Sequence, residues 1–350
     1  MIRVGVDAWN LPGDHRGIGR YLREILRVWR ERESSRVEAT LIVPEWHTWT
    51  VRQRYRRELE DFPYRVVSRR FHAGAPLDAL WFPFNGCSWT RFTLPATATL
   101  HDASNFVVSE YAPETQQIFR AAARRCKALI TDSRFAQAEL ARELAIASER
   151  IVPIALGVSP PRPPLPVALD VRALQPFVLY VGTAERRKGF DTLLDAMARA
   201  AQQRPDLRLV VTTKLEGWTP APGVRVVELG YVDDDVLATL YRACALLAFP
   251  SRYEGFGLPV LEAMSYGAPV VASNASSVPE AGGDAACYTP PGDADLLAAA
   301  ILRVAGDAAY AQDLRRRGPI HAAEFTWERT ASRTLAVIEE TATATGRSYR

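Results

Sequence analysis

Apolar residues follow two different periods along this chain. Short aliphatic runs predict buried β-strands, whereas apolar side chains spaced by three or four residues predict amphipathic helices. The predicted strands are Ile2–Val6, Thr40–Val43, Thr97–Leu100, Leu129–Thr131, Phe177–Val181, Leu207–Thr212, Val224–Val227, Leu246–Phe249 and Pro269–Ala272. Helical spacing is clearest at Tyr21, Leu22, Ile25, Leu26 and Trp29, and again at Phe190, Leu193, Leu194 and Met197. Apolar strands that alternate with helices indicate parallel sheets covered on both faces.

The pattern breaks at the proline-rich segment Ser159–Pro166, which cannot continue a helix or a strand. We therefore predict an α/β protein with two Rossmann-like β/α/β domains facing a central cleft. The predicted division is a first domain at 1–160, a linker at 161–176, a second domain at 177–325 and a C-terminal segment at 326–350. That segment contains a predicted helix, Trp327–Thr343, which we expect to cross back onto the first domain because no strand follows it. Ligands of such folds bind at the carboxyl ends of the strands.

Composition narrows the class of protein. The 350 residues are 48% hydrophobic and 24% charged, which excludes wholesale disorder, and a net charge of +3 is too small to indicate nucleic-acid binding. The four cysteines form no CxxC pair, so neither a zinc site nor a disulfide framework is predicted. The first residues predict a strand, so we expect no leader peptide, and no apolar run approaches the roughly 18 residues of a spanning helix. We expect a cytoplasmic protein, at most peripheral to a membrane.

Candidate chemistry is densest between Phe249 and Met264, where a strand is followed by a glycine-bearing loop and a helix. Pro259 suits the first turn of that helix, because its missing N–H has no partner there anyway. The free backbone N–H groups and the positive helix end form an anion site. Glu254 and Glu262, eight residues apart, would face a polyhydroxylated ligand, one at a sugar and one at a ribose. The alternative is a capped helix with two solvated glutamates.

A second strand, Phe177–Val181, also runs into a loop before a helix. Arg187 and Lys188 are adjacent in that loop, where two cations would bind a diphosphate and neutralise a leaving group. Lys188 is one of only three lysines in the chain, which favours a function for it. The alternative is a pair of solvated surface charges.

The first predicted strand leads to Arg16-Gly-Ile-Gly-Arg-Tyr21. Gly17 and Gly19 would let the backbone approach a phosphate or a sugar closely. Leu22 fills the third glycine position of GxGxxG, which counts against dinucleotide binding. A plain flexible turn is the alternative.

His101 and Asp102 follow the predicted strand Thr97–Leu100 and would lie at its carboxyl end. The imidazole would transfer a proton or bind a sugar hydroxyl, with Asp102 orienting it. The alternative is a structural histidine. Of the other histidines, His15 is the second candidate because it lies near the glycine loop.

Two charged segments have simpler interpretations. Asp233–Asp235 resembles an acidic metal-binding motif, but apolar residues at helical spacing follow it, which favours a helix start. Arg52–Arg70 contains seven arginines and three acidic residues. We interpret it as a solvated face, with contact to an anionic membrane or a pyrophosphate-bearing acceptor as the alternative.

Together these segments resemble the retaining glycosyltransferases of family 4, whose GT-B fold consists of two Rossmann-like domains. Glu254 and Glu262 match the family's E-x7-E signature. The other matching segments, in the family's order, are Gly17–Tyr21, His101-Asp102, Thr131–Ser133, Gly182–Gly189, Gly230–Val232 and Pro279-Glu280. The resemblance covers roughly residues 2–340.

The resemblance implies transfer of a hexose from a nucleotide diphosphate sugar with retention of configuration and without a metal or other cofactor. The second domain would bind the donor and the first the saccharide or lipid-linked acceptor. It further implies that Glu262 binds the ribose and that the transferred sugar is bound by Glu254 and by the N–H groups of Gly255, Phe256, Gly257 and Leu258. The diphosphate would be bound by Arg187, Lys188, Gly17 and Gly19. His101 would lie beside the anomeric centre or a donor hydroxyl. Front-face attack is expected, and a covalent route stays open.

Two departures from the family bear on the donor and on the linker. Thr183 stands where many relatives have arginine, and the Arg187-Lys188 pair resembles mannosyltransferases of bacterial surface-polysaccharide assembly, including lipopolysaccharide. GDP-mannose is therefore the expected donor, with UDP-glucose or a UDP-N-acetylhexosamine as alternatives. Leu156 stands where relatives commonly have asparagine. A nucleotide-sugar epimerase and a non-catalytic nucleotide-sugar-binding protein remain the competing function classes.

Overall fold

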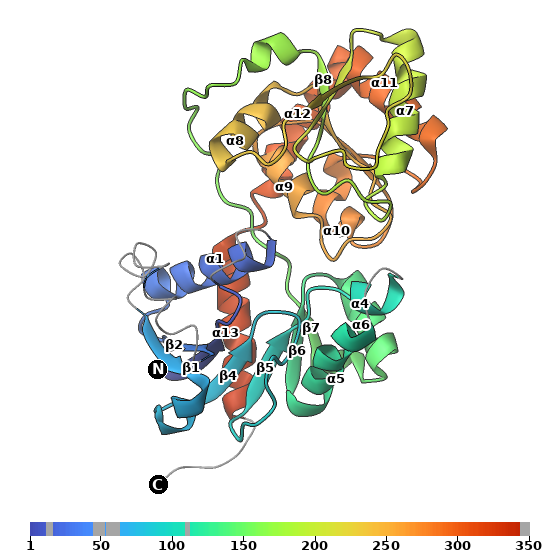
Figure 1. Cartoon of the computed structure of the whole chain (residues 1–350). Coiled ribbons are helices and arrows are strands. Elements are labelled where there is room, and N and C mark those ends of the chain that lie inside the picture. The colour runs from blue at the N-terminus through green and yellow to red at the C-terminus, as the bar shows by residue number, and fades with distance from the viewer. Residues whose placement is uncertain (12–16, 45–52, 54–63, 109–112, 344–350) are drawn as a thin grey trace. The chain divides into compact units, whose positions relative to one another are not determined.

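A computed structural model describes residues 1–11, 17–44, 53, 64–108 and 113–343 of the chain. It divides into two compact units (Figure 1). Unit 1 comprises Met1–Gly157 together with Thr326–Arg350, and unit 2 comprises Val158–Phe325. Each unit is built on one parallel sheet with helices packed against it, so the predicted pair of Rossmann-like domains is confirmed. No helix within the described residues combines the length and the apolar character needed to span a bilayer.

The sheet of unit 1 has seven parallel strands in the order β3-β2-β1-β4-β5-β6-β7. These strands are β1 (Ile2–Asp7), β2 (Val37–Val43), β3 (Arg65–Ser68), β4 (Ala79–Phe82), β5 (Ala96–Thr99), β6 (Ala128–Thr131) and β7 (Ile151–Pro153). The helices described are α1 (Gly17–Arg32), α4 (Ser104–Val107), α5 (Gln116–Arg125), α6 (Arg134–Leu144) and α13 (Trp327–Thr343), with short 3₁₀ turns η2 (Arg69–Gly74), η3 (Pro113–Thr115) and η4 (Ser148–Arg150). Because all strands are parallel, their carboxyl ends lie at one edge of the sheet.

The C-terminal helix α13 completes unit 1 rather than unit 2. It packs against α1 and the central strands, and Trp29 Nε1 donates to the Ala331 carbonyl oxygen over 3.0 Å. The chain re-enters unit 1 beside Gly157, where a Cβ would lie 2.3 Å from the backbone nitrogen of Trp327. No larger residue fits this approach. The predicted helix and its return to the first domain are confirmed.

The sheet of unit 2 has six parallel strands in the order β10-β9-β8-β11-β12-β13. They are β8 (Phe177–Tyr180), β9 (Arg208–Val211), β10 (Arg225–Glu228), β11 (Leu246–Phe249), β12 (Val270–Ser273) and β13 (Cys287–Thr289). The helices are α7 (Phe190–Gln203), α8 (Asp234–Ala243), α9 (Leu258–Ser265), α10 (Val278–Gly282), α11 (Ala294–Gly306) and α12 (Ala308–Ala322), with η5 (Val171–Leu174) and η6 (Gly283–Ala285). The core lies between the sheet and the adjacent helices α7 and α11, around Leu193, Met197, Leu209 and Ile301.

All nine predicted strands are present, and the structure adds four: β3, β4, β7 and β13. Three of these lie at sheet edges, are only partly buried and include polar residues or proline, so no continuous aliphatic run marks them. The fourth, β4, is a run of four apolar residues that ends at Pro83. Its burial in the middle of the sheet is decided by its neighbours β1 and β5.

Candidate active site

The candidate site of unit 2 begins where β8 and β11 end. These strands are neighbours in the sheet, and the strand order reverses between them. Loops that leave neighbouring parallel strands at such a reversal form the usual ligand site of an open α/β sheet. The loops touch, because a Cβ on Gly189 would lie 2.1 Å from the Pro250 carbonyl oxygen. Gly189 also has a φ of +67°, so glycine is required there twice over.

Lys188 and Glu254 link the two loops. Lys188 Nζ lies 3.3 Å from Glu254 Oε1, and the two side chains are 19% and 13% exposed. Ser251 donates from Oγ to the same carboxylate oxygen over 2.8 Å. The Lys188 stem lies against Gly182, where a Cβ would be 3.5 Å from Lys188 Cδ. The cation predicted for a diphosphate and the carboxylate predicted for a sugar are therefore in direct contact.

Arg187 is also held between the loops. Its guanidinium donates to the Tyr253 carbonyl oxygen over 3.0 Å and to Glu185 Oε2 over 3.3 Å. Its side chain is only 16% exposed. Two adjacent, partly buried cations supply the charge-assisted donors that a diphosphate requires, in competition with Glu185 and Glu254. The alternative of two solvated surface charges does not fit this burial.

Arg252 links the loop after β11 to the first turn of α7. Its guanidinium donates to both Asp191 carboxylate oxygens, over 2.8 and 3.0 Å, and to Thr192 Oγ1 over 2.9 Å. Burial alone would raise the pKa of Asp191, but the hydrogen bonds from Arg252 and the Thr192 N–H, together with the charges of Arg252 and Arg186, outweigh it and lower that pKa below its ordinary value. This bidentate pair restrains the loop that carries Glu254.

The loop then enters α9 with its backbone fixed. Glu254 donates its N–H to Ser276 Oγ over 3.0 Å and accepts at its carbonyl from Ser277 Oγ over 2.7 Å. Gly257 precedes the helix with a φ of +105°, and Pro259 lies in the first turn as predicted. The predicted sugar-binding N–H groups lie in and before this first turn, at Gly255, Phe256, Gly257 and Leu258. The Phe256 side chain is buried, so only its backbone is suited to a ligand.

Glu262 lies farther along α9 and is partly buried rather than freely solvated. Tyr241, on α8, donates from its hydroxyl to Glu262 Oε2 over 3.2 Å. The carboxylate predicted to bind ribose therefore has a protein donor that fixes one of its oxygens.

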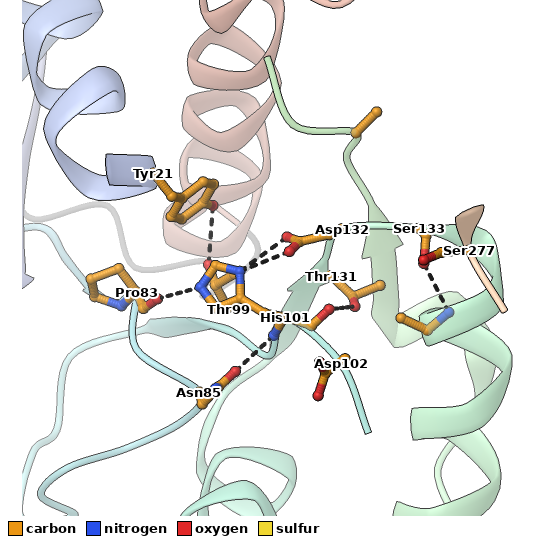
Figure 2. Close-up of polar contacts among 12 residues, drawn as sticks. Tyr21, Pro83, Asn85, Thr99, His101, Asp102, Thr131, Asp132, Ser133 and Ser277 are labelled. Atoms are coloured by element: carbon orange, nitrogen blue, oxygen red, sulfur yellow. Dashed lines mark hydrogen bonds and ion pairs between the residues drawn. The ribbon is translucent and has the colours of Figure 1, made fainter. Parts of the chain in front are cut away.

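In unit 1, His101 follows β5 and lies in a closed cluster (Figure 2). Its Nδ1 is 2.9 Å from Asp132 Oδ2, and its Nε2 is 3.0 Å from the Pro83 carbonyl oxygen. The Tyr21 ring packs edge-on at a centroid distance of 4.9 Å. With Asp132 ionised, both partners are acceptors, so the imidazole satisfies them together only when both nitrogens carry protons. Burial opposes this protonation, but Asp132 and the Pro83 carbonyl outweigh it and raise the pKa of His101.

The prediction that Asp102 orients His101 is wrong. Asp102 accepts the backbone N–H of Ser104 over 2.8 Å at the start of α4, and Figure 2 shows its side chain directed away from the imidazole. The orienting carboxylate is Asp132, which follows β6, the strand next to β5. Proton transfer by His101 would require one of its two ring contacts to break.

The glycine motif of unit 1 forms the first turn of α1. Gly17 is exposed, and a Cβ there would meet nothing within 4 Å, whereas Gly19 is buried. Crowding by the protein therefore does not explain the glycine at position 17. His15, the second histidine candidate, lies outside the described residues.

Most of the arginine-rich segment 52–70 also lies outside the described residues. The interpretation as a solvated face is wrong for Arg69. Its guanidinium donates to Asp7 Oδ1 over 3.1 Å and to Ser88 Oγ over 2.5 Å. Asp7 is buried, which raises its pKa despite the neighbouring arginine.

The acidic run Asp233–Asp235 starts α8, as predicted. Asp233 accepts the N–H groups of Asp235 and Val236 over 3.0 and 2.8 Å. Asp234 and Asp235 form ion pairs with Arg162. Within the ranges that the structure describes, no group of three histidine, cysteine, aspartate or glutamate side chains is arranged to hold a metal ion.

Sequence reasoning missed the side chains that support the predicted site residues. Asp132, Ser276 and Tyr241 hold His101, Glu254 and Glu262, respectively, from other segments, and Ser251 holds Glu254 from within the same loop. Only Asp132 had a signal, because it follows a predicted strand just as His101 does. The contacts of Ser276 and Tyr241 depend on which loops and helices become neighbours.

The comparisons with known proteins identify the family and the fold. Residues 175–307 match the family model for glycosyl transferases group 1. The O-antigen chain mannosyltransferase B of Escherichia coli is 34% identical over 299 residues, which cover 78% of this chain and 78% of that protein.

Two solved structures are similar to the whole chain. A sucrose-phosphate synthase from Thermosynechococcus elongatus has a TM-score of 0.72 at 22% identity and covers 98% of this chain and 100% of its own. Anabaena HepE in complex with UDP-glucose has a TM-score of 0.70 at 18% identity and covers 97% of this chain and 100% of its own. At these identities the likeness shows the fold alone, and that fold is the predicted GT-B fold.

Proposed function

Because this chain belongs to the group 1 glycosyl transferases, we propose that it moves a hexose from a nucleotide diphosphate sugar to a saccharide or lipid-linked saccharide, with retention of anomeric configuration. The observation that carries the proposal is the Lys188–Glu254 contact. It brings a cation suited to a diphosphate and a carboxylate suited to sugar hydroxyls together at the β8/β11 reversal.

In this proposal Arg187 and Lys188 bind the diphosphate and stabilise the charge that grows on it as it leaves. A bound diphosphate competes with Glu254 for Lys188, which frees the carboxylate to accept sugar hydroxyls. The N–H groups from Gly255 to Leu258 bind the sugar at the positive end of α9. Glu262 accepts the ribose hydroxyls. The roles predicted for Gly17, Gly19 and His101 stay predictions.

The bond changes balance without an external base. The bond from the anomeric carbon to the diphosphate breaks, and the acceptor oxygen bonds to the same face of that carbon. The departing phosphate oxygen takes the proton of the acceptor hydroxyl, so no protein residue needs to change its protonation state. A covalent route through a carboxylate gives the same stereochemistry.

Mannose from GDP-mannose is the favoured donor. The support is the E. coli relative, which is a mannosyltransferase, together with the Arg187-Lys188 pair. UDP-glucose is the first alternative, because HepE was crystallised with that nucleotide sugar. Asp233–Asp235 is engaged in a helix cap and in ion pairs, which supports a reaction that needs no metal.

The test is a thermal-shift panel with GDP, UDP, ADP, dTDP and their sugars, with and without EDTA, followed by NMR of the transfer product. We expect GDP and GDP-mannose to raise the melting temperature equally with and without EDTA, and the product to keep the donor's anomeric configuration. An inverted product contradicts retention. Isomerised donor without a glycoside indicates an epimerase, and binding without turnover indicates a non-catalytic protein. Activity abolished by EDTA restores the metal role of Asp233–Asp235.

A further inference from the structure

The Glu262 carboxylate accepts a hydrogen bond from a buried tyrosine. Tyr241 is 1% exposed, and its hydroxyl donates to Glu262 Oε2 over 3.2 Å. A glutamate side chain has three rotatable bonds, so one fixed donor restricts it strongly. Each carboxylate oxygen accepts more than one hydrogen bond, and ribose hydroxyls therefore have room on the same group.

A second tyrosine restricts the first. Tyr266 lies one helical turn after Glu262, and its ring stacks on Tyr241 with a centroid distance of 5.7 Å and an interplanar angle of 16°. The Arg242 guanidinium lies 4.7 Å from the Tyr266 ring centroid, a cation–π contact. The Tyr241 ring thus has a stacked neighbour that limits its movement.

The outer end of this chain of contacts is Arg162, in the proline-rich segment. Its backbone N–H donates to the Tyr266 hydroxyl over 3.2 Å, and its carbonyl accepts from the Arg242 guanidinium. Its own guanidinium pairs with Asp234 at 2.8 Å and with Asp235 at 3.1 Å. One exposed residue is therefore attached to unit 2 through its N–H, its carbonyl and its side chain.

We propose that Tyr241 and Tyr266 are positioning residues that hold the Glu262 carboxylate in the orientation that binds ribose, and that Arg162 anchors the pair. This inference rests on the ribose role assigned to Glu262 under the proposed function. It predicts that the proline-rich segment contributes to nucleotide affinity without contacting the nucleotide. The chain of contacts runs Arg162, Tyr266, Tyr241, Glu262.

Tyr241→Phe removes only the hydroxyl and tests the central contact. The probes in calorimetry are GDP and 2′,3′-dideoxy-GDP, which lacks the ribose hydroxyls. If the nucleotide panel selects UDP, the probes are UDP and 2′,3′-dideoxy-UDP. We expect Tyr241→Phe to weaken GDP binding about 5- to 10-fold, the size of one lost hydrogen bond. Its affinity for the dideoxy compound should match that of the wild type, which also serves as the internal control for folding.

A double-mutant cycle separates positioning from general packing. Glu262→Gln alone should weaken GDP but not the dideoxy compound, and Tyr241→Phe added to it should have no further effect. If Glu262→Gln leaves GDP binding unchanged, or if neither nucleotide binds the wild type, the ribose role itself fails. If Glu262→Gln weakens GDP but Tyr241→Phe does not, or if Tyr241→Phe weakens both probes equally, only the positioning role fails.

Arg162→Gln tests the anchor and keeps the backbone contacts. We expect a GDP affinity about 2-fold lower at low salt, with the difference disappearing at high salt because exposed ion pairs are screened. The matched control is Arg204→Gln. Arg204 pairs with Asp206 at 2.8 Å on the surface of unit 2, and that pair has no contact with either tyrosine. Equal changes in the two variants, or no change for Arg162→Gln at low salt, contradict the anchor.

Discussion

Charged residues follow the strands in both units, but their surroundings differ. The unit 2 residues lie in the loops after β8 and β11, and the unit 1 residues lie around His101. In unit 2, Lys188 and Glu254 are partly exposed, and among the described residues Glu254 is the one acidic partner within ion-pair distance of Lys188. In unit 1, His101 and Asp132 are buried, and both ring nitrogens of His101 have protein acceptors. The first pair has donor capacity left for a ligand, whereas the second is complete by itself.

This difference teaches that a charged residue after a buried strand is not yet a ligand-binding residue. What matters is whether the fold satisfies the group from within. By this criterion Lys188 is suited to a ligand, and His101 is suited to holding the ends of β4, β5 and β6 together. The comparison predicts that substitutions in unit 2 affect turnover and that substitutions around His101 affect stability.

The largest effect is expected for Lys188→Ala. Removing a cation that stabilises the leaving diphosphate should lower kcat/KM by about 100- to 1000-fold. The thermal stability should change little, because the ion pair with Glu254 is partly exposed. Lys127→Ala, an exposed lysine of unit 1, is the matched control. Steady-state transfer assays measure both, and an unchanged kcat/KM for Lys188→Ala would remove this residue from the site.

Asp132→Asn should act on stability instead. It leaves a buried imidazolium without its counter-charge, and the free energy of unfolding should fall by about 3 kcal/mol. The control is Asp78→Asn, whose ion pair with Arg3 lies at the surface and should cost less than about 1 kcal/mol. Urea unfolding followed by tryptophan fluorescence compares the two. Equal losses would contradict the assignment of His101 as a buried imidazolium that depends on the Asp132 charge.

A smaller effect is expected from pH. Folding raises the pKa of His101, so the contribution of this group is complete below the unfolded pKa of about 6.5 and is lost as pH rises through the folded value. Stability should therefore decline above about pH 6.5, by at most about 1.4 kcal/mol per pH unit. His101→Gln should remove this slope. His321→Gln, in unit 2, should keep it, and a slope that persists in His101→Gln assigns it to another group.

Much of the architecture follows from local patterns. The nine predicted strands, the helix Trp327–Thr343 and the α8 start at Asp233 are all present, because period and helix capping act within a few residues. The edge strands β3, β7 and β13 were missed because these short segments include polar residues or proline instead of a continuous aliphatic run. Their pairing with longer strands makes them part of the sheet.

The positions of the candidate site residues were predicted from the sequence, but one of their contacts was not. The sequence placed Arg187, Lys188, Glu254 and Glu262 on loops and a helix at the ends of strands, and the structure describes them there. It assigned the wrong carboxylate to His101, since Asp102 is adjacent in sequence whereas Asp132 is adjacent in the sheet.

The sequence by itself determined the elements, the type of sheet and the loops that carry charge, because periodicity, turn residues and caps are local properties. Tertiary structure alone decided which side chains meet. Tyr241 on α8 contacts Glu262 on α9, and Cys87 Sγ lies 3.5 Å from Cys126 Sγ although 39 positions separate them. Strand order and helix packing set these contacts, and both follow from burying apolar surface over the whole unit rather than from any single segment.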